Sequence, residues 1–440
     1  SVAGSPAVKA VHTPLMAFSV GPVIRSACEQ GWKKSTERKK AMLIKATLSN
    51  ARHPEYGEVT IPFPIKTSEY DHTMEMLANL EIGNVMGRDC KIMELSSPYS
   101  ILQKLEGSEV NIDELDYLAK RLESFEADQD LQFQAAAFAR GVTSIEDFIN
   151  LTFCSDRATV IYDFTNLEAV GRQHFMNLYG GCASMEELEN LDGYETALLL
   201  IDGGGAEITP YGVLYDNGMQ MEQLYKGGSF PPYLYDAYEL VLPISPAQDP
   251  QNKTYLYLPS SDLQLERTLL RGEIMEREGW FHKLEPIQLS GVITEKLDTR
   301  RDSIRELNEM CRSIHQLSHA DRAKLDAAVE YTHAKTARQI RQVTEHLDQF
   351  DFAPGVHTPE EYGRYMIRDS GHFDYDSNLD EFYDYGKYGR QHLEQSQGMF
   401  TEQGYISYHG ILSLETLMKE APTEQFQEEQ GEDLEMGGLT

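Results

Sequence analysis

The residues of this chain that could do chemistry are carboxylates that recur at close spacing in the middle of its first half. They lie in a helix predicted to begin after Asn111, in the turn that follows it, and at the start of the next helix. Helical neighbours three or four residues apart are separated by about 5–6 Å, and one DNA strand carries a charge about every 3.4 Å. Such carboxylates can imitate a row of phosphates or form an ordinary solvated face. The candidate phosphate-mimicking residues are Asp113, Glu114, Asp116, Glu123, Glu126, Asp128, Asp130, Glu146 and Asp147.

The overall charge is typical of a soluble acidic protein and is also what a protein with a basic partner would carry. The 440 residues contain 39 Lys and Arg against 71 Asp and Glu, a formal net charge of −32. Such a field repels nucleic acid and anionic membranes and attracts basic surfaces. The acidity is regional: residues 51–250 carry 34 acidic against 11 basic residues, residues 251–350 carry 16 against 15, and residues 351–440 carry 19 against 5. We therefore expect neither a nucleic-acid nor a membrane partner.

Cysteine usage and hydropathy narrow the class further. The five cysteines are scattered and form no Cys-x-x-Cys pair, so neither a disulfide framework nor a zinc site is predicted, and a reducing cytoplasm fits. No apolar run reaches the length of a membrane span.

Patterns that resemble catalytic or ligand-binding motifs are incomplete. Gly203–Gly205 follow an apolar run, residues 196–202, that reads as a strand, but the G-x-G-x-x-G spacing of a nucleotide site is absent. His315 and His319 lack the glutamate of a zinc-protease helix. Asp374 and Asp376 lack the glycine and terminal glutamate of a calcium loop. We predict no enzyme, no metal and no cofactor.

The elements that must position the carboxylates can be read from periodicity. Three strands are predicted at residues 42–48, 59–65 and 90–95, with Pro62 and Pro64 favouring an edge position for the second. Ser68 is predicted to cap a helix that runs to Leu80, and Ser144 one that follows the alanine-rich helix 131–140. The helix after Asn111 is amphipathic. Its apolar positions are Ile112, Leu115, Leu118, Leu122 and Phe125.

The chain repeats itself at an offset of 192 in residue number. Gly212 and Gly218 recur as Gly404 and Gly410, and the apolar stripe of the helix after Asn111 recurs from Ile304. Gly171-Arg172 recur as 363–364, but residues 171–174 also recur letter for letter as 389–392, at an offset of 218. Self-similarity over this length predicts a tandem duplication, with the alignment of its last third left open.

The repeat divides the chain into segments. Residues 219–232 are rich in glycine and proline and are predicted to be a linker. The predicted segments are a basic extension 1–40, repeat A at 41–218 (parts 41–97, 98–156 and 157–218), the linker 219–232, repeat B at 233–411 (parts 233–288, 289–347 and 348–411) and an acidic, disordered tail 412–440. Whether the extension is a solvated arm or a docking arm stays open.

Near the end of repeat B the sequence resembles the carboxy-terminal part of the ArdA antirestriction proteins of conjugative plasmids and transposons. The similar residues are Tyr385, Tyr388, Gly389, Arg390, Gly398, Phe400, Gly404 and Gly410. Repeat A has Val170 at the place of the second tyrosine, so the motif is weaker there.

The resemblance implies an α+β fold in which each repeat places small α+β end domains around a helical middle domain, in an elongated molecule. It further implies a cytoplasmic protein of a bacterial host that mimics bent duplex DNA and occupies the DNA-binding surface of type I restriction-modification enzymes. ArdA proteins act as dimers, so two copies in one chain imply an internal pseudo-dimer; a homodimer of the whole chain stays open.

Two alternatives remain beside this reading: inhibition of another nucleic-acid-binding defence complex, such as a CRISPR effector, and an acidic scaffold without mimicry. The helical part of repeat B departs from a mimic because it is nearly neutral. Its cations either pair with acids of repeat A or indicate another role. They are Arg305, Arg312, Arg322, Lys324, Lys335, Arg338 and Arg341.

Overall fold

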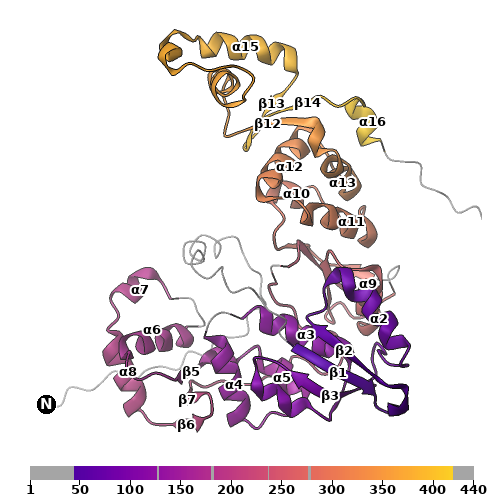
Figure 1. Ribbon diagram of the computed structural model, residues 1–440, viewed down its shortest axis with the longest axis vertical. Coiled ribbons are helices and arrows are strands. Elements are labelled where there is room, and N and C mark those ends of the chain that lie inside the picture. The colour runs from indigo at the N-terminus through magenta and orange to yellow at the C-terminus, as the bar shows by residue number, and fades with distance from the viewer. Residues whose placement is uncertain (1–43, 126–127, 180–182, 236, 276–278, 420–440) are drawn as a thin grey trace, which may run out of the picture.

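The computed structural model describes residues 44–419 except 126–127, 180–182, 236 and 276–278 (Figure 1). The whole predicted extension, residues 1–40, and residues 420–440 of the predicted tail lie outside the described residues. The described chain combines helices with four small antiparallel sheets, so the predicted α+β class is confirmed.

The first sheet has the strand order β2-β1-β3-β4. Its strands are β1 (Ile44–Asn50), β2 (Glu58–Phe63), β3 (Cys90–Ser96) and β4 (Glu109–Val110). Alternate residues of β1, such as Ile44 and Ala46, are fully buried. The strand β2 lies at the edge, as its prolines predicted. The next helix, α2, spans Tyr70–Ala78 and follows a short 3-10 turn, so the predicted cap by Ser68 is wrong.

Three helices follow: α3 (Ile112–Glu123), α4 (Gln129–Ala139) and α5 (Ile145–Leu151). Asn111 caps α3 by accepting a hydrogen bond from the amide of Asp113, and Glu114 completes a capping box. Ser144 caps α5 in the predicted way, by accepting from the amide of Asp147. The predicted apolar stripe of α3 faces the main core of the first half.

The first half ends in a smaller unit that we call end unit A, residues 158–216. It contains β5 (Ala158–Ile161), α6 (Leu167–Leu178), α7 (Met185–Glu189), α8 (Gly193–Asp202), β6 (Ala206–Thr209) and β7 (Gly212–Asp216). The predicted strand at 196–202 is wrong, because this run belongs to α8. Asp192 caps that helix through the amide of Glu195, and the apolar run packs as a helix with small residues inward.

The second half repeats this order of elements. Its first part contains β8 (Leu240–Pro246), β9 (Thr254–Leu258), α9 (Asp262–Arg271), β10 (Gly279–Phe281) and β11 (Glu285–Pro286). Its helices are α10 (Gly291–Thr294), α11 (Ile304–His315), α12 (His319–Thr332) and α13 (Ala337–Glu345). Its last part, which we call end unit B, contains β12 (Phe350–Pro354), α14 (Pro359–Arg364), α15 (Tyr385–Ser396), β13 (Met399–Phe400), β14 (Gly404–Tyr408) and α16 (Leu414–Met418).

From α3 onward several matching elements of the two halves keep one offset along the chain, whereas β1 and β8, which begin at 44 and 240, do not share it. The helices α3 and α11 begin at 112 and 304, and α8 and α15 begin at 193 and 385. The last sheets have the matching orders β5-β7-β6 and β12-β14-β13. The alternative offset joins Gly171 in α6 to Gly389 in α15, which are different elements, so the structure decides against that alignment.

Glycines allow the paired helices of each end unit to approach closely. A Cβ at Gly171 of α6 would lie 1.7 Å from the carbonyl oxygen of Gly193 in α8. A Cβ at Gly363 of α14 would lie 2.0 Å from the carbonyl oxygen of Tyr385 in α15. No side chain fits in either position, so the recurring glycine is required by helix packing.

Residues 219–232 have no helix or strand but are not a free linker, because Tyr225 is fully buried in the core of the first half. In Figure 1 the helices α10–α13 and end unit B extend away from the first half, which makes the molecule elongated.

We expect Gly363→Ala to lower the free energy of unfolding by about 1–3 kcal/mol, because the added methyl group separates α14 from α15. Denaturant unfolding measures this change. The matched control is Gly291→Ala, where no atom lies within 4 Å of the new Cβ and the expected change stays within about 0.5 kcal/mol. Equal midpoints for the two variants would contradict the packing role.

Candidate interaction surface

The carboxylates predicted at the start of α3 are not on the surface. Glu114 and Asp116 are only 2% and 5% exposed, and the side chain of Asp113 is 13% exposed. The prediction that these three project toward solvent is therefore wrong. Each of them forms hydrogen bonds and ion pairs inside the protein, and the three have different sets of partners.

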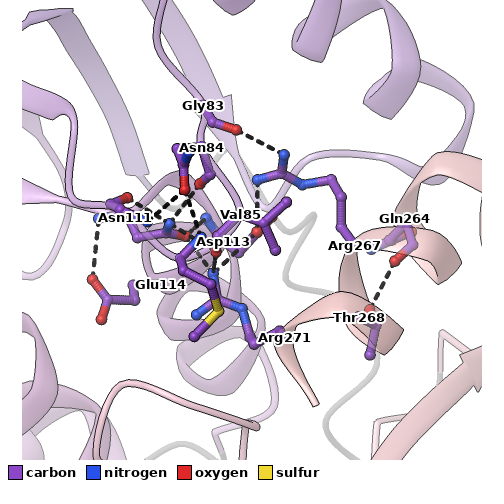
Figure 2. Close-up of polar contacts among 12 residues, drawn as sticks. Gly83, Asn84, Val85, Asn111, Asp113, Glu114, Gln264, Arg267, Thr268 and Arg271 are labelled. Carbon is purple, nitrogen blue, oxygen red and sulfur yellow. Dashed lines mark hydrogen bonds and ion pairs between the residues drawn. The ribbon is translucent and has the colours of Figure 1, made fainter. Parts of the chain in front are cut away.

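Asp113 binds two arginines of the second half (Figure 2). Arg267 and Arg271, one turn apart on α9, place their Nη2 atoms 2.8 and 3.2 Å from Asp113 Oδ2. Arg267 also donates to the carbonyl oxygen of Gly83 at 2.7 Å, and Arg271 to Asn111 Oδ1 at 2.6 Å. Both guanidinium groups are almost fully buried, so the contact joins the two halves in a site from which water is largely excluded.

Glu114 and Asp116 bind partners in the first half or in residues 219–232, which follow it. Glu114 accepts from the hydroxyl of Tyr225 at 2.9 Å and pairs with Arg88 at 2.9 Å. Asp116 pairs with Lys120 at 2.8 Å and accepts from the amide of Ile65 at 2.7 Å. Burial raises the pKa of the Asp116 carboxyl, while the Lys120 ammonium opposes that shift. These contacts explain why α3 is rich in acids without forming an acidic surface.

The remaining candidates are divided. Glu123 accepts from the hydroxyl of Tyr235, Asp130 from that of Tyr99, and Glu146 pairs with Arg88. These three are half-buried, as is Asp147, which accepts from the hydroxyl of Ser144 at 2.8 Å. Glu126 lies outside the described residues. Among the described candidates, Asp128 is the one that is exposed, so the nine carboxylates do not form one surface.

The exposed acids lie in the end units instead. Residues 158–225 contain eleven Asp and Glu against one basic residue, Arg172, which pairs with Glu168 at 2.7 Å. The exposed acids of this region are Asp163, Glu186, Glu187, Glu189, Asp192, Glu195, Asp202, Glu207, Asp216 and Glu222. The charge count along the chain contained this signal, whereas the helical spacing of residues 113–130 indicated a different group of acids.

End unit B also contains more acidic than basic residues, but the excess is smaller than in end unit A. Residues 350–419 contain twelve acids against five basic residues. The exposed acids are Asp351, Glu360, Glu361, Asp369, Asp374, Asp376, Glu381, Asp384, Glu394, Glu402 and Glu415. The two ends of the repeats thus present carboxylates to solvent.

The arginines in the helical part of the second half pair within that half. Arg338 binds Glu306 at 2.8 Å, Arg305 binds Glu309 at 3.1 Å, and Arg341 also pairs with Glu309. Arg322 of α12 binds the fully buried Glu239 at 2.7 Å. The alternative that the cations of α11–α13 pair with acids of repeat A is therefore wrong for these four. Three of them pair with glutamates of α11, and Arg322 pairs with Glu239 next to β8.

Comparison with known families now adds one finding. The family model described as antirestriction protein (ArdA) matches residues 256–407. These residues belong to the ArdA antirestriction family. The ArdA region runs from β9 to β14 and lies within the predicted repeat B. No curated protein matches the chain.

The residues that carried the resemblance to ArdA have packing roles in end unit B. Tyr385 is 7% exposed and donates to Asp380, and Gly389 lies where a Cβ would be 1.7 Å from the carbonyl oxygen of Pro359. Gly398 makes room for Tyr405, whose ring lies 5.3 Å from that of Phe400. Gly404 has φ +146°, and Gly410 lies just beyond the ArdA region. Arg390 is exposed and Tyr388 is half-buried.

Other kinds of site receive no support from the described residues. They contain no cluster of three or more His, Cys, Asp or Glu side chains that could hold a metal ion. None of their helices is long and apolar enough to cross a membrane. The cavity between the halves, lined by Tyr117 and Arg267 among others, measures about 90 Å³, far below the usual size of a small-molecule site.

We expect Asp113→Asn to lower the free energy of unfolding by about 3–5 kcal/mol, because it leaves two buried arginines without their carboxylate. The matched control Asp128→Asn removes the same charge from an exposed position and should change stability by less than about 0.5 kcal/mol. Denaturant unfolding tests both. If Asp113→Asn is as stable as the control, the ion pairs do not join the halves.

Proposed function

We propose that this protein is an antirestriction inhibitor that imitates DNA and thereby occupies the DNA-binding surface of type I restriction-modification enzymes. The ArdA region, residues 256–407, is the observation that carries the proposal. The exposed carboxylates of the end units support the mechanism, because an enzyme surface built for phosphates presents Lys and Arg. In this proposal the protein catalyses no reaction.

We also propose that the chain is a tandem duplication of an ArdA-like unit that forms an internal pseudo-dimer. Three observations support this: the similar order of elements, the offset shared by α3 with α11 and by α8 with α15, and the matching glycine contacts at Gly171 and Gly363. The buried ion pairs between Asp113 and the arginines of α9 join the two units. Sedimentation of the whole chain tests the idea, and an obligate homodimer would contradict it.

The imitation of phosphates is assigned to exposed acids of the end units rather than to α3. In end unit A, the acids of α7 and α8 lie on helices with one basic neighbour, Arg172, which is already paired. Because phosphate contacts position a protein without reading sequence, such a surface should act on enzymes of several DNA specificities.

The direct test mixes the protein with a type I restriction-modification enzyme and its DNA and measures displacement of the DNA at low and moderate salt. Displacement that weakens as salt rises is expected, since charge contacts with a DNA-binding surface are salt-dependent. Binding that does not change with salt would contradict mimicry. Displacement from a CRISPR effector alone would redirect the proposal to another defence complex.

A four-site variant tests which acids matter. We expect neutralising Glu186, Glu189, Glu195 and Asp202 to weaken binding on the order of tenfold at about 0.1 M salt and to reduce the salt dependence, by analogy with lost phosphate contacts. The measurement is the affinity for the enzyme over a salt series.

The matched control for that variant neutralises four exposed acids of the first sheet and its helix, Glu58, Glu75, Glu94 and Glu109. It changes the net charge equally, so general electrostatic attraction falls by the same amount. Equal loss of affinity in the two variants would show that net charge, and not end unit A, is responsible.

A further inference from the structure

The outer side of α8 combines acids with large apolar side chains. Tyr194 and Leu199 are 54% and 68% exposed, and Leu198 is exposed beside them. Glu195 and Asp202 are exposed on the same side of that helix. We call these five residues the α7–α8 face, because α7, with its exposed Met185, directly precedes this helix in the chain. Apolar groups gathered in this way on a surface commonly mark a binding site.

The equivalent helix of the second half shows that the fold does not require such a face. Both helices pack inward through small residues, Gly193 and Ala197 in α8 and Gly389 in α15. At the offset that relates the two halves, Glu195, Leu198 and Leu199 correspond to Lys387, Arg390 and Gln391, which are exposed and polar. The same packing is thus compatible with an ordinary solvated surface. The exposed apolar groups of α8 are therefore not required by the fold and indicate that something binds there.

The chemistry of the face describes that occupant. It must offer apolar side chains and positive charge together. The outer side of α15 offers positive charge without apolar groups, so a second copy of that helix is a poor match. The carboxy-terminal segment 420–440 contains seven acids and no Lys or Arg, so it would be repelled.

Residues 1–43, which lie outside the described residues, have the required composition. They contain seven Lys and Arg against two Glu, and five of the cations fall within residues 33–40. An apolar stretch, residues 11–24, and Trp32 precede this basic run. A segment of this length can reach on the order of 100 Å when extended, and its attachment to the same chain gives it a high effective concentration at the face.

We propose that residues 1–43 bind the α7–α8 face, with apolar residues against Tyr194, Leu198 and Leu199 and the basic run against the acids. The segment then covers part of the surface assigned to the target enzyme, which must displace it. That regulatory consequence rests on the proposed function; the contact itself does not.

Zero-length carbodiimide cross-linking of the full chain at low concentration tests the contact. We expect amide links from Lys33, Lys34, Lys39 or Lys40 to Glu186, Glu189, Glu195 or Asp202. Mixing isotopically light and heavy chains separates links within a chain from links between chains. Links confined to end unit B, links found only between chains, or no links from these lysines would each overturn the proposal.

Tryptophan fluorescence gives a second readout that needs no enzyme. The chain has two tryptophans, Trp32 and Trp280, so Trp280→Phe leaves Trp32 as the reporter. We expect acrylamide to quench Trp32 several-fold less in the full chain than in a synthetic peptide of residues 1–43. Equal quenching would overturn the proposal.

The variant Tyr194→Ser/Leu198→Ser/Leu199→Ser should raise the quenching of Trp32 to the value of the peptide. A matched control, Phe373→Ser/Phe382→Ser, removes exposed aromatic groups from end unit B and should leave it unchanged. A failure of the protein to displace DNA from any enzyme would contradict the proposed function without altering these readouts. The two proposals can therefore be tested independently.

Discussion

The buried ion pairs between Asp113 and the two arginines of α9 are the contact on which the arrangement of the halves depends. Three charged side chains are removed from water there, and their desolvation is offset by short, charge-assisted hydrogen bonds to each other, to Asn111 and to the backbone of residue 83. Removing any one of the three side chains would leave a buried charge without its partner and destabilise the fold. It also specifies the position of α9 on α3 more narrowly than apolar packing would, because hydrogen bonds are directional.

Ion pairs and hydrogen bonds inside the protein leave few carboxylates of α3 facing the solvent. The acids of α3 are used to hold Arg88, Lys120 and the arginines of α9, and to accept from tyrosine hydroxyls. In the second half, Arg305, Arg338 and Arg341 are likewise paired with glutamates of α11, and Arg322 pairs with Glu239 next to β8. Most charges of these helices are therefore compensated by partners inside the protein, some of them across the two halves. The field that a partner meets comes from the end units, where acids far outnumber cations.

The two halves share a backbone plan but differ in surface. The helices α8 and α15 are each approached closely by a neighbouring helix at a glycine, Gly171 of α6 and Gly363 of α14. The outward positions are free of that constraint and have diverged, apolar and acidic in α8, basic and polar in α15. The packing between paired helices can thus be kept in both halves while their exposed surfaces differ.

Several features followed from local sequence because local interactions produce them. The caps at Asn111 and Ser144, the amphipathic stripe of α3, the edge position of β2 and the offset between the halves all depend on neighbours in the chain or on self-comparison. The resemblance to ArdA was likewise readable from one short segment. Local signals conflict in the apolar run 196–202, and there the prediction of a strand was wrong. The run folds as α8, because Asp192 caps that helix and because Gly193 and Ala197 allow it to pack against α6.

Whether each carboxylate is buried or exposed could not be predicted from local sequence in the same way. Whether Asp113 is a surface charge or a buried anchor depends on Arg267 and Arg271, which lie far along the chain in the second half. Burial is a property of the assembled halves, and the energy of a charge depends on the solvent and partners around it. Spacing along a helix therefore identified the acids of α3, and only the tertiary structure showed that they face inward while those of α7 and α8 face the solvent.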